Sequence, residues 1–369
     1  MPPISVPLRA PELAPGVWVQ GPEVSIRGLR GRVGLIDFWE STCVNCLRTL
    51  PYLKAWHERY AGRGLAMVGV HTPEFEMSAD PALVAAAVRD EGIPWSVLLD
   101  AGRATWTRFA NKYWPALYLI DARGYLRYER FGEGAYGETE QWIQRLLREA
   151  GDAAPLPEIL EPVRAEDRPG AVCHAATRET HLGFHRGRLL AAEGYRPDEE
   201  VRHAAGEPAP PGMFGARGLW LHEAEYLESR EPGAGLDLVC DAAGVNLVLA
   251  PDGELEIDVD GAPVPPEERG ADLVERAGRT FAVWERARLV RLIDSDVFRR
   301  RRLALRFPRV GTRAYAFSFA TCALITPALF SRPLPPPAPG EEGENHPRSE
   351  DSYPSPGEGG WEGTGEGQG

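Results

Sequence analysis

Residues 33–51 read VGLIDFWESTCVNCLRTLP, and this stretch decides the fold that we expect for the N-terminal half of the chain. The apolar run Val33–Phe38 predicts a short buried strand, and the sequence from Cys43 onward predicts a helix. Cys43 and Cys46 are three residues apart, so a helix would place both sulfurs on one face. A sulfur at a helix start faces unpaired N–H groups and the positive end of the helix dipole, which favour the nucleophilic thiolate. The pattern therefore indicates a disulfide-exchange centre.

The same stretch resembles the thioredoxin superfamily, in which an apolar strand ending in D-F-W precedes a C-x-x-C motif. Asp37 lies six residues before Cys43, where thioredoxin itself carries a buried acid. Pro51 lies eight residues after Cys43, where thioredoxins carry a helix-kinking proline. The blocks TCVNCLRTLPYLKAW, VGVHTPEFE, YWPALYLID and GEGAYGETE resemble the soluble part of DipZ-type proteins, a TlpA-like thioredoxin domain followed by a β-rich domain. Glu40 and Ser41 depart from the aromatic and threonine residues common in that family.

The fold that follows is an α/β thioredoxin-like sandwich, then an all-β sandwich or jelly-roll domain. In the first domain, alternating strands and helices are expected at 17–26, 33–38, 43–60, 65–70, 82–90, 95–99, 105–111, 116–120, 125–131 and 139–150. In the second, short strands between turn signals are expected at 219–227, 236–240, 246–250, 254–259, 280–292, 303–307 and 313–319. The expected segments are an irregular N-terminal arm at 1–16, the thioredoxin-like domain at 17–150, a linker at 151–170, the β-sandwich domain at 171–331 and a disordered acidic, Pro/Gly-rich tail at 332–369.

The charge distribution argues against a nucleic-acid partner. The 369-residue chain has a formal net charge of −13, and eight acids with one arginine between Pro333 and Gly369 place −7 of this in the tail. A nucleic-acid-binding protein would need a basic face. The short run Arg299–Arg302 is expected to be a solvated strand end.

The five cysteines do not form a regular framework. Cys173, Cys240 and Cys322 stand in apolar contexts and are expected to be buried, inert thiols. For Cys43 and Cys46 the alternative is half of a structural zinc site, but the chain has no second C-x-x-C motif. We therefore expect no metal and no cofactor apart from a redox-active Cys43–Cys46 disulfide.

Three residues are expected to carry the chemistry. Cys43 would attack a substrate disulfide, and Cys46, one turn deeper, would resolve the mixed disulfide. Asp37, on the strand beneath, would have a raised pKa and accept the Cys46 proton. The alternative for Asp37 is a hydrogen-bonded core residue without a kinetic role.

Three further residues are expected to bind substrate. The resemblance implies that Pro115 is a cis-proline opposite the C-x-x-C motif, although an ordinary trans-proline before a strand is the alternative. The backbone of Trp114 would pair with an extended substrate strand. Trp39 and Trp114 would flank the cysteines as a substrate platform, unless they are core aromatics.

The function expected from these residues is a thiol–disulfide oxidoreductase that reduces protein disulfides. The alternative is a binding protein whose β-domain recognises a partner or a carbohydrate. Its candidate aromatic residues, which core packing explains more simply, are Trp220, Tyr226, Trp284 and Tyr315.

The partners and location are also expectations. The electron donor would be thioredoxin-reductase-like or CcdA-like. The N-terminus lacks an apolar signal core and no run approaches the ~20 apolar residues of a membrane span, so we expect a cytoplasmic chain without membrane insertion. The family resemblance points instead to the cell envelope.

Overall fold

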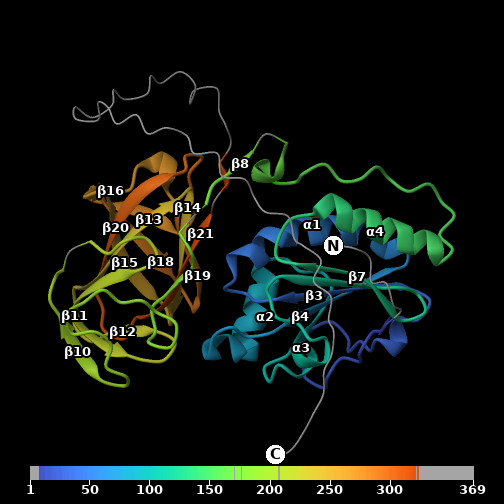
Figure 1. The fold of residues 1–369 in the computed structure, drawn as a ribbon, viewed down its shortest axis with the longest axis horizontal. Coiled ribbons are helices and arrows are strands. Elements are labelled where there is room, and N and C mark those ends of the chain that lie inside the picture. Colours follow the sequence, from blue (N-terminus) through green and yellow to red (C-terminus); the bar gives the residue numbers. More distant parts are fainter. Residues whose placement is uncertain (1–7, 170, 176, 207, 321, 324–369) are drawn as a thin grey trace, which may run out of the picture. The chain divides into compact units, whose positions relative to one another are not determined.

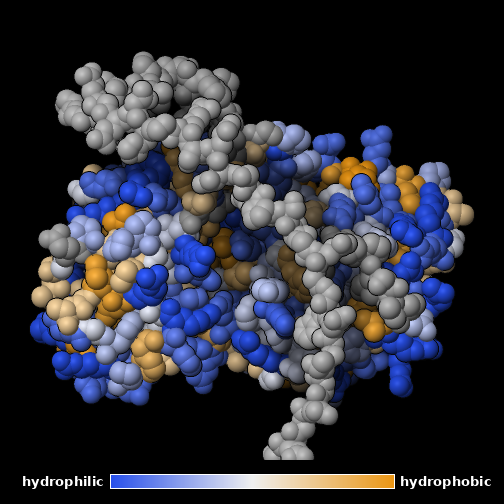
Figure 2. Space-filling model, in the orientation of Figure 1, coloured by the Kyte–Doolittle hydropathy of each residue, from blue (hydrophilic) through white to orange (hydrophobic). Residues whose placement is uncertain are grey.

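Figure 1 shows a computed structural model, which describes residues 8–169, 171–175, 177–206, 208–320 and 322–323. Helices gather in the N-terminal half, and the C-terminal half consists almost entirely of strands. The predicted tail at 332–369 lies outside the described residues. Among the described helices, none is long and apolar enough to cross a bilayer. The face seen in Figure 2 is largely hydrophilic, with apolar residues scattered over it.

The N-terminal half is built on a seven-stranded sheet with β3 at its centre. Strand β3 pairs in parallel with β4 and antiparallel with β6, in the order β1-β7-β6-β3-β4-β5-β2. The strands are β1 (Leu8–Arg9), β2 (Val17–Gln20), β3 (Val33–Trp39), β4 (Leu65–His71), β5 (Ser96–Leu99), β6 (Ala116–Ile120) and β7 (Tyr125–Phe131). Central strands that are apolar throughout are typical of a sheet covered on both faces, and both faces of this sheet are covered.

The helices divide between the two faces. Helices α1, α2 and α4 contribute to the core cluster that contains Leu35 and Trp39, whereas α3 belongs to the cluster of Ile36 and Phe38 on the other face. Because strand side chains alternate, Asp37 points to the same face as Leu35 and Trp39, where α1 lies. The helices are α1 (Val44–Tyr60), α2 (Pro81–Asp90), α3 (Ala104–Arg108) and α4 (Tyr136–Glu149), with short 3₁₀ turns at Arg27–Leu29, Ala61–Arg63, Glu76–Ala79, Ala165–Asp167 and Pro266–Glu268.

The segments expected to be irregular are packed against this sheet. From residue 8 the arm includes β1, where Leu8 pairs with Leu126. Along the expected linker, the Glu140 carboxylate accepts the Leu160 N–H at 2.7 Å. Farther along, the Tyr52 hydroxyl donates to Asp167 at 2.7 Å. The chain from 152 to 167 is therefore attached to the thioredoxin-like half.

The C-terminal half is one continuous antiparallel sheet that curls around a single core. The second part of strand β11 pairs with β10 and β12, and its first part, from Phe214 to Arg217, pairs with β13, which joins the two layers of the predicted sandwich. The strands are β8 (Val172–Cys173), β9 (Thr180–His181), β10 (Glu200–His203), β11 (Phe214–His222), β12 (Leu227–Ser229), β13 (Ala234–Ala242), β14 (Gly244–Ala250), β15 (Gly253–Val259), β16 (Ala262–Pro263), β17 (Leu273–Arg276), β18 (Arg279–Trp284), β19 (Arg288–Ile293), β20 (Arg299–Phe307), β21 (Arg313–Ala320) and β22 (Cys322–Ala323), of which β8 and β22 pair separately.

Several expectations for this half are corrected. The single strand expected at 280–292 is broken at residues 285–287 into β18, which pairs with β15 and β17, and β19, which pairs with β14; together they are called the β18–β19 segment below. In the arginine run at the start of β20, Arg300 and Arg302 are exposed as expected, but Arg301 is fully buried and bonds to Glu268 at 3.1 Å. Trp220, Trp284 and Tyr315 are buried, which supports core packing over an open sugar site.

The isolated cysteines behave differently from one another. Cys240 is buried as expected, and burial raises the pKa of its thiol to about 12. The expectation for Cys173 is wrong, because this residue is exposed and disulfide-bonded. The backbone of Cys322 pairs with Cys173 across β8 and β22, while the Cys322 side chain lies outside the described part.

Candidate active site

The turn after β3 delivers Cys43 to the start of α1 as its N-cap residue. Its backbone is extended, with φ −85° and ψ 109°, and its sulfur accepts the Cys46 N–H at 3.2 Å. Such a cap satisfies one of the helix's unpaired N–H groups and points the sulfur at the positive end of the helix dipole. Cys43 therefore lies at the helix start, as the sequence predicts.

The two sulfurs lie together but differ in access. Cys43 is half-buried and Cys46 is 1% exposed. Both are free thiols, and their Sγ atoms are 2.6 Å apart, against about 2.05 Å in a disulfide. A bond between them needs only a small movement.

Burial and two neighbouring charges keep Cys46 protonated. Burial raises the pKa of the Cys46 thiol well above its usual value, and Cys43 and Asp37 raise it further. The backbone of Glu40 hydrogen-bonds to this thiol and opposes the rise in pKa. Cys46 therefore needs a group that takes its proton before it becomes a nucleophile.

Asp37 is the buried acid beneath Cys46. It is 1% exposed, and neither carboxyl oxygen has a hydrogen-bond partner among the described residues. Burial raises the pKa of Asp37 to about 8. A core aspartate retained for structure would be hydrogen-bonded, so this geometry favours a role in proton transfer.

Pro115 and Trp114 lie at the same end of the sheet as the cysteines. The Trp114–Pro115 peptide bond is cis, as predicted. Ala116 pairs with Phe38 near the end of β3, which places Pro115 beside the point where the chain leaves for Cys43. Trp114 is half-buried and packs against Trp106, with 4.4 Å between ring centroids.

Trp39 is not an exposed platform. It is 1% exposed, it belongs to the core under α1, and its indole meets the His71 ring edge-on at 5.0 Å. As the last residue of β3 it points inward with Leu35, so the core-aromatic alternative describes it.

The structure adds Glu40 and His71, which hold the turn before Cys43. The Glu40 carboxylate accepts the Thr42 N–H at 2.6 Å, and the Glu40 carbonyl accepts the Cys43 N–H at 3.2 Å. His71, at the end of β4, accepts the Ser41 N–H on Nε2 at 3.1 Å. The departure from the family pattern at Glu40 and Ser41 is the sequence signal for this network.

Glu40 and His71 are not an ion pair, although their nearest atoms are 3.8 Å apart and both are buried. Burial lowers the pKa of His71 to about 3, so its ring is neutral at physiological pH. Burial is also the main cause that raises the pKa of Glu40 to about 7. A second carboxyl with a near-neutral pKa therefore lies within three residues of Cys43.

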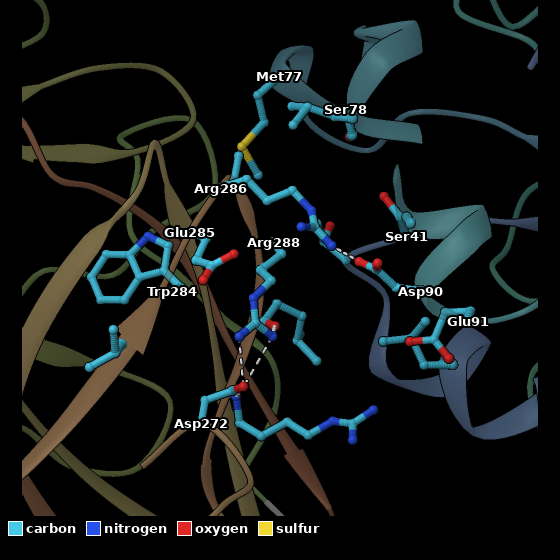
Figure 3. A pocket seen from close by; sticks show the side chains of 18 residues that line it. Ser41, Met77, Ser78, Asp90, Glu91, Asp272, Trp284, Glu285, Arg286 and Arg288 are labelled. Atoms are coloured by element: carbon cyan, nitrogen blue, oxygen red, sulfur yellow. Dashed lines mark hydrogen bonds and ion pairs between the residues drawn. The ribbon is translucent and has the colours of Figure 1, made fainter. Parts of the chain in front are cut away.

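A cavity of about 440 Å³ opens beside this turn, between α2 and the β18–β19 segment (Figure 3). Ser41, Thr42 and Leu47 line it from the cysteine side. Trp284 and Leu289 line it from the β18–β19 segment. Sequence reasoning missed this wall, because no local pattern shows which strands of the second half lie opposite α2.

Residues of the VGVHTPEFE block hold the β half against the thioredoxin-like half beside this cavity. Phe75 is 2% exposed and packs against Tyr315, with 5.1 Å between ring centroids. Val44 and Leu47 pack against the same cluster. Val44 stands between the two cysteines, so the β half covers one side of the C-x-x-C motif.

A possible cation site near this interface already holds a positive charge. Glu74, Glu179 and His181 lie close enough to share an ion. The Arg186 guanidinium binds Glu74 at 2.7 Å, however, and takes up that carboxylate. The expectation of no metal stays a prediction.

Comparison with known proteins places these features in a family. The profile described as "AhpC/TSA family" matches residues 9–129, and the one described as "Thioredoxin like C-terminal domain" matches residues 177–320. Thiol-disulfide oxidoreductase YkuV of Bacillus subtilis is 30% identical over 133 residues, which are 36% of this chain and 88% of YkuV. This chain belongs to the thioredoxin superfamily of thiol–disulfide oxidoreductases.

A second relative also covers much of the β half. Protein DipZ of Mycobacterium tuberculosis is 36% identical over 253 residues, which are 67% of this chain and 35% of DipZ. The chain thus spans about a third of the length of its DipZ relatives. A thioredoxin-like protein solved in its oxidised form is 28% identical, with 40% of this chain and 99% of that chain covered and a TM-score of 0.37.

Proposed function

We propose that the chain is a protein-disulfide reductase that works by thiol–disulfide exchange at Cys43 and Cys46. The observation that carries this proposal is the pair of thiols 2.6 Å apart, one half-exposed at a helix start and one buried above an unpartnered carboxyl. The named oxidoreductase relatives support the reaction class. The pair itself would be the only redox group, without a further cofactor.

In the first step the Cys43 thiolate attacks one sulfur of a substrate disulfide. The substrate S–S bond breaks, a Cys43–substrate disulfide forms, and the leaving substrate thiolate takes a proton. In the second step the ionised form of Asp37 takes the proton of Cys46, and the Cys46 sulfur attacks the Cys43 sulfur. A Cys43–Cys46 disulfide forms, the second substrate sulfur leaves as a thiolate and takes a proton, and two electrons have passed to the substrate.

Trp114 and Pro115 would position the substrate chain during these steps. Their place at the end of β3 supports pairing between the Trp114 backbone and an extended substrate segment. A thiol-based donor, thioredoxin-reductase-like or CcdA-like, would return the pair to the reduced state. The site of action, cytoplasm or envelope, follows from which donor is used.

The order of the cysteines is tested by trapping. Cys46→Ser should accumulate mixed disulfides with substrate proteins, because nothing resolves the Cys43 adduct. Cys43→Ser should trap almost none, because Cys46 is buried and protonated. Equal trapping by both variants would overturn the assignment.

The direction of electron flow is tested by the reduction potential. Val44 and Asn45 place no positive charge between the cysteines, and an ionised Asp37 opposes the thiolate, so the oxidised form is favoured. We expect a potential on the order of −250 mV, near the thioredoxin end of the range. A value above about −180 mV in glutathione buffers would refute the reductase direction.

A further inference from the structure

We infer that the cavity between α2 and the β18–β19 segment binds an apolar side chain of the protein substrate, next to the cysteine that Cys43 attacks. This inference rests on the exchange function proposed above and adds a substrate class to it. It also gives the β half a direct part in substrate binding.

The position of the cavity follows from the turn around Cys43. Ser41 and Thr42 immediately precede Cys43, and Leu47 lies one helical turn after it; all three line the cavity. An extended chain advances about 3.3–3.6 Å per residue. A substrate whose cysteine meets Cys43 therefore reaches the cavity with the next residue or two.

The chemistry of the lining favours an uncharged, apolar occupant. Figure 3 shows Arg286 reaching across to Asp90, and Arg288 binds Asp272 at 2.6 Å. These ion pairs take up the charges of Arg286 and Arg288, whereas Glu91, Glu285 and Arg291 line the cavity without an ion-pair partner among the described residues. An acidic substrate side chain would therefore lose its hydration beside two unpaired carboxylates.

Apolar side chains supply the remaining contacts from both halves. Residues of this kind in the lining are Leu47, Met77, Leu83, Ala87, Val283, Trp284, Ala287 and Leu289. Methionine is flexible and polarisable, which lets one site accept apolar side chains of different shapes. A volume of about 440 Å³ lies within the range of roughly 300–1,000 Å³ typical of ligand sites, ample for one large side chain.

The wall from the β half is fixed in place. Leu289 and Ala287 belong to the apolar cluster around Phe75, which anchors the β18–β19 segment to the loop after β4. The Arg286–Asp90 pair joins the bend between β18 and β19 to the end of α2. The cavity is thus a formed feature of both halves.

The test measures the single-turnover rate constant of the reduced full chain on three probes. Two are disulfide-linked peptides that are identical except for Leu or Asp beside the cysteine, and the third is hydroxyethyl disulfide, which is too small to fill the cavity. We expect the Leu peptide to react about tenfold faster than the Asp peptide, as burial of a leucine side chain predicts.

Two variants fill the cavity from opposite walls, Ala87→Trp on α2 and Ala287→Trp in the bend between β18 and β19. Each should lower the ratio of the Leu-peptide to the hydroxyethyl-disulfide rate constant about tenfold. The matched control is Ala82→Trp, at an exposed position of α2 outside the lining, which should keep the wild-type ratio.

Equal rate constants for the two peptides, or a ratio unchanged by both cavity-filling variants, would overturn the inference while the exchange function stands. Failure to reduce hydroxyethyl disulfide would overturn the proposed function itself, and the inference with it.

Discussion

Arg301 in the β half and Asp37 in the thioredoxin-like half are both buried ionisable residues, but their surroundings are opposite. Arg301 donates to Glu268 at 3.1 Å and to the carbonyls of Val297 and Ala242. Asp37 has no hydrogen-bond partner among the described residues. Buried polar groups are normally partnered, since an unpartnered one costs free energy of folding.

The difference separates structural from chemical roles within one chain. A partnered arginine keeps its charge and fixes β20 to its neighbours. The Asp37 carboxyl, without a hydrogen-bond partner among the described residues, has a pKa near physiological pH. It can therefore exchange a proton with a neighbouring thiol that must lose one. The two halves should therefore respond to substitution in opposite directions.

The largest effect is expected from Asp37→Asn. The folded pKa of about 8 exceeds the ordinary 3.8, so the folded chain keeps a proton that the unfolded chain has lost between these values. Stability therefore falls as pH rises through this window, by at most about 6 kcal/mol. Asn does not titrate, so the reduced variant should be more stable than wild type at pH 8 and similar near pH 4, measured by urea unfolding.

The same substitution should slow resolution of the mixed disulfide near neutral pH more than it slows the attack by Cys43. Stopped-flow mixing with a disulfide peptide separates the two steps. If the variant gains the same stability at pH 4 and pH 8 and resolves the mixed disulfide at the wild-type rate, Asp37 has a structural role only.

Arg301→Met should act in the opposite direction. Methionine keeps much of the volume but leaves the carbonyls of Val297 and Ala242 without their donor, so we expect a loss of about 3 kcal/mol in urea unfolding. The rate of thiol exchange at Cys43, measured on the folded fraction of the variant, should equal the wild-type value. A neutral effect on stability would remove the contrast with Asp37.

The sequence predicted much of the N-terminal site because its signals are local. Cys43, Cys46 and Asp37 lie within ten residues of one another, and the cis bond before Pro115 follows a recognisable block. Trp39 was ambiguous because a strand end does not reveal which face is covered.

What the sequence did not predict depends on contacts between distant segments. The burial of Arg301 requires Glu268 and Ala242 to converge on β20. The cavity wall requires the β18–β19 segment to lie opposite α2. Glu40 was visible as a departure from the family pattern, but only its contacts with Thr42 and the neighbouring His71 show why it matters.

Glu40→Gln should have a smaller effect of the same sign as Asp37→Asn. The pKa of Glu40 rises from 4.5 to about 7 in the folded chain, so stability is lost as pH rises between these values. Gln can still accept the Thr42 N–H, so the variant should gain about 3 kcal/mol at pH 8 relative to pH 4.

The smallest effect is expected from deleting 333–369. This segment is rich in Gly, Pro and Glu, a composition that cannot bury an apolar core, so its loss should shift the thermal midpoint by less than about 2 °C. A longer deletion, 313–369, also removes β21, which pairs with β12 and β14 through residues such as Ala314. That deletion should unfold the β half and leave the Asp37 region as the more stable part. If the short deletion lowers the midpoint as much as the long one, the tail contributes to folding and the division into two halves must be redrawn.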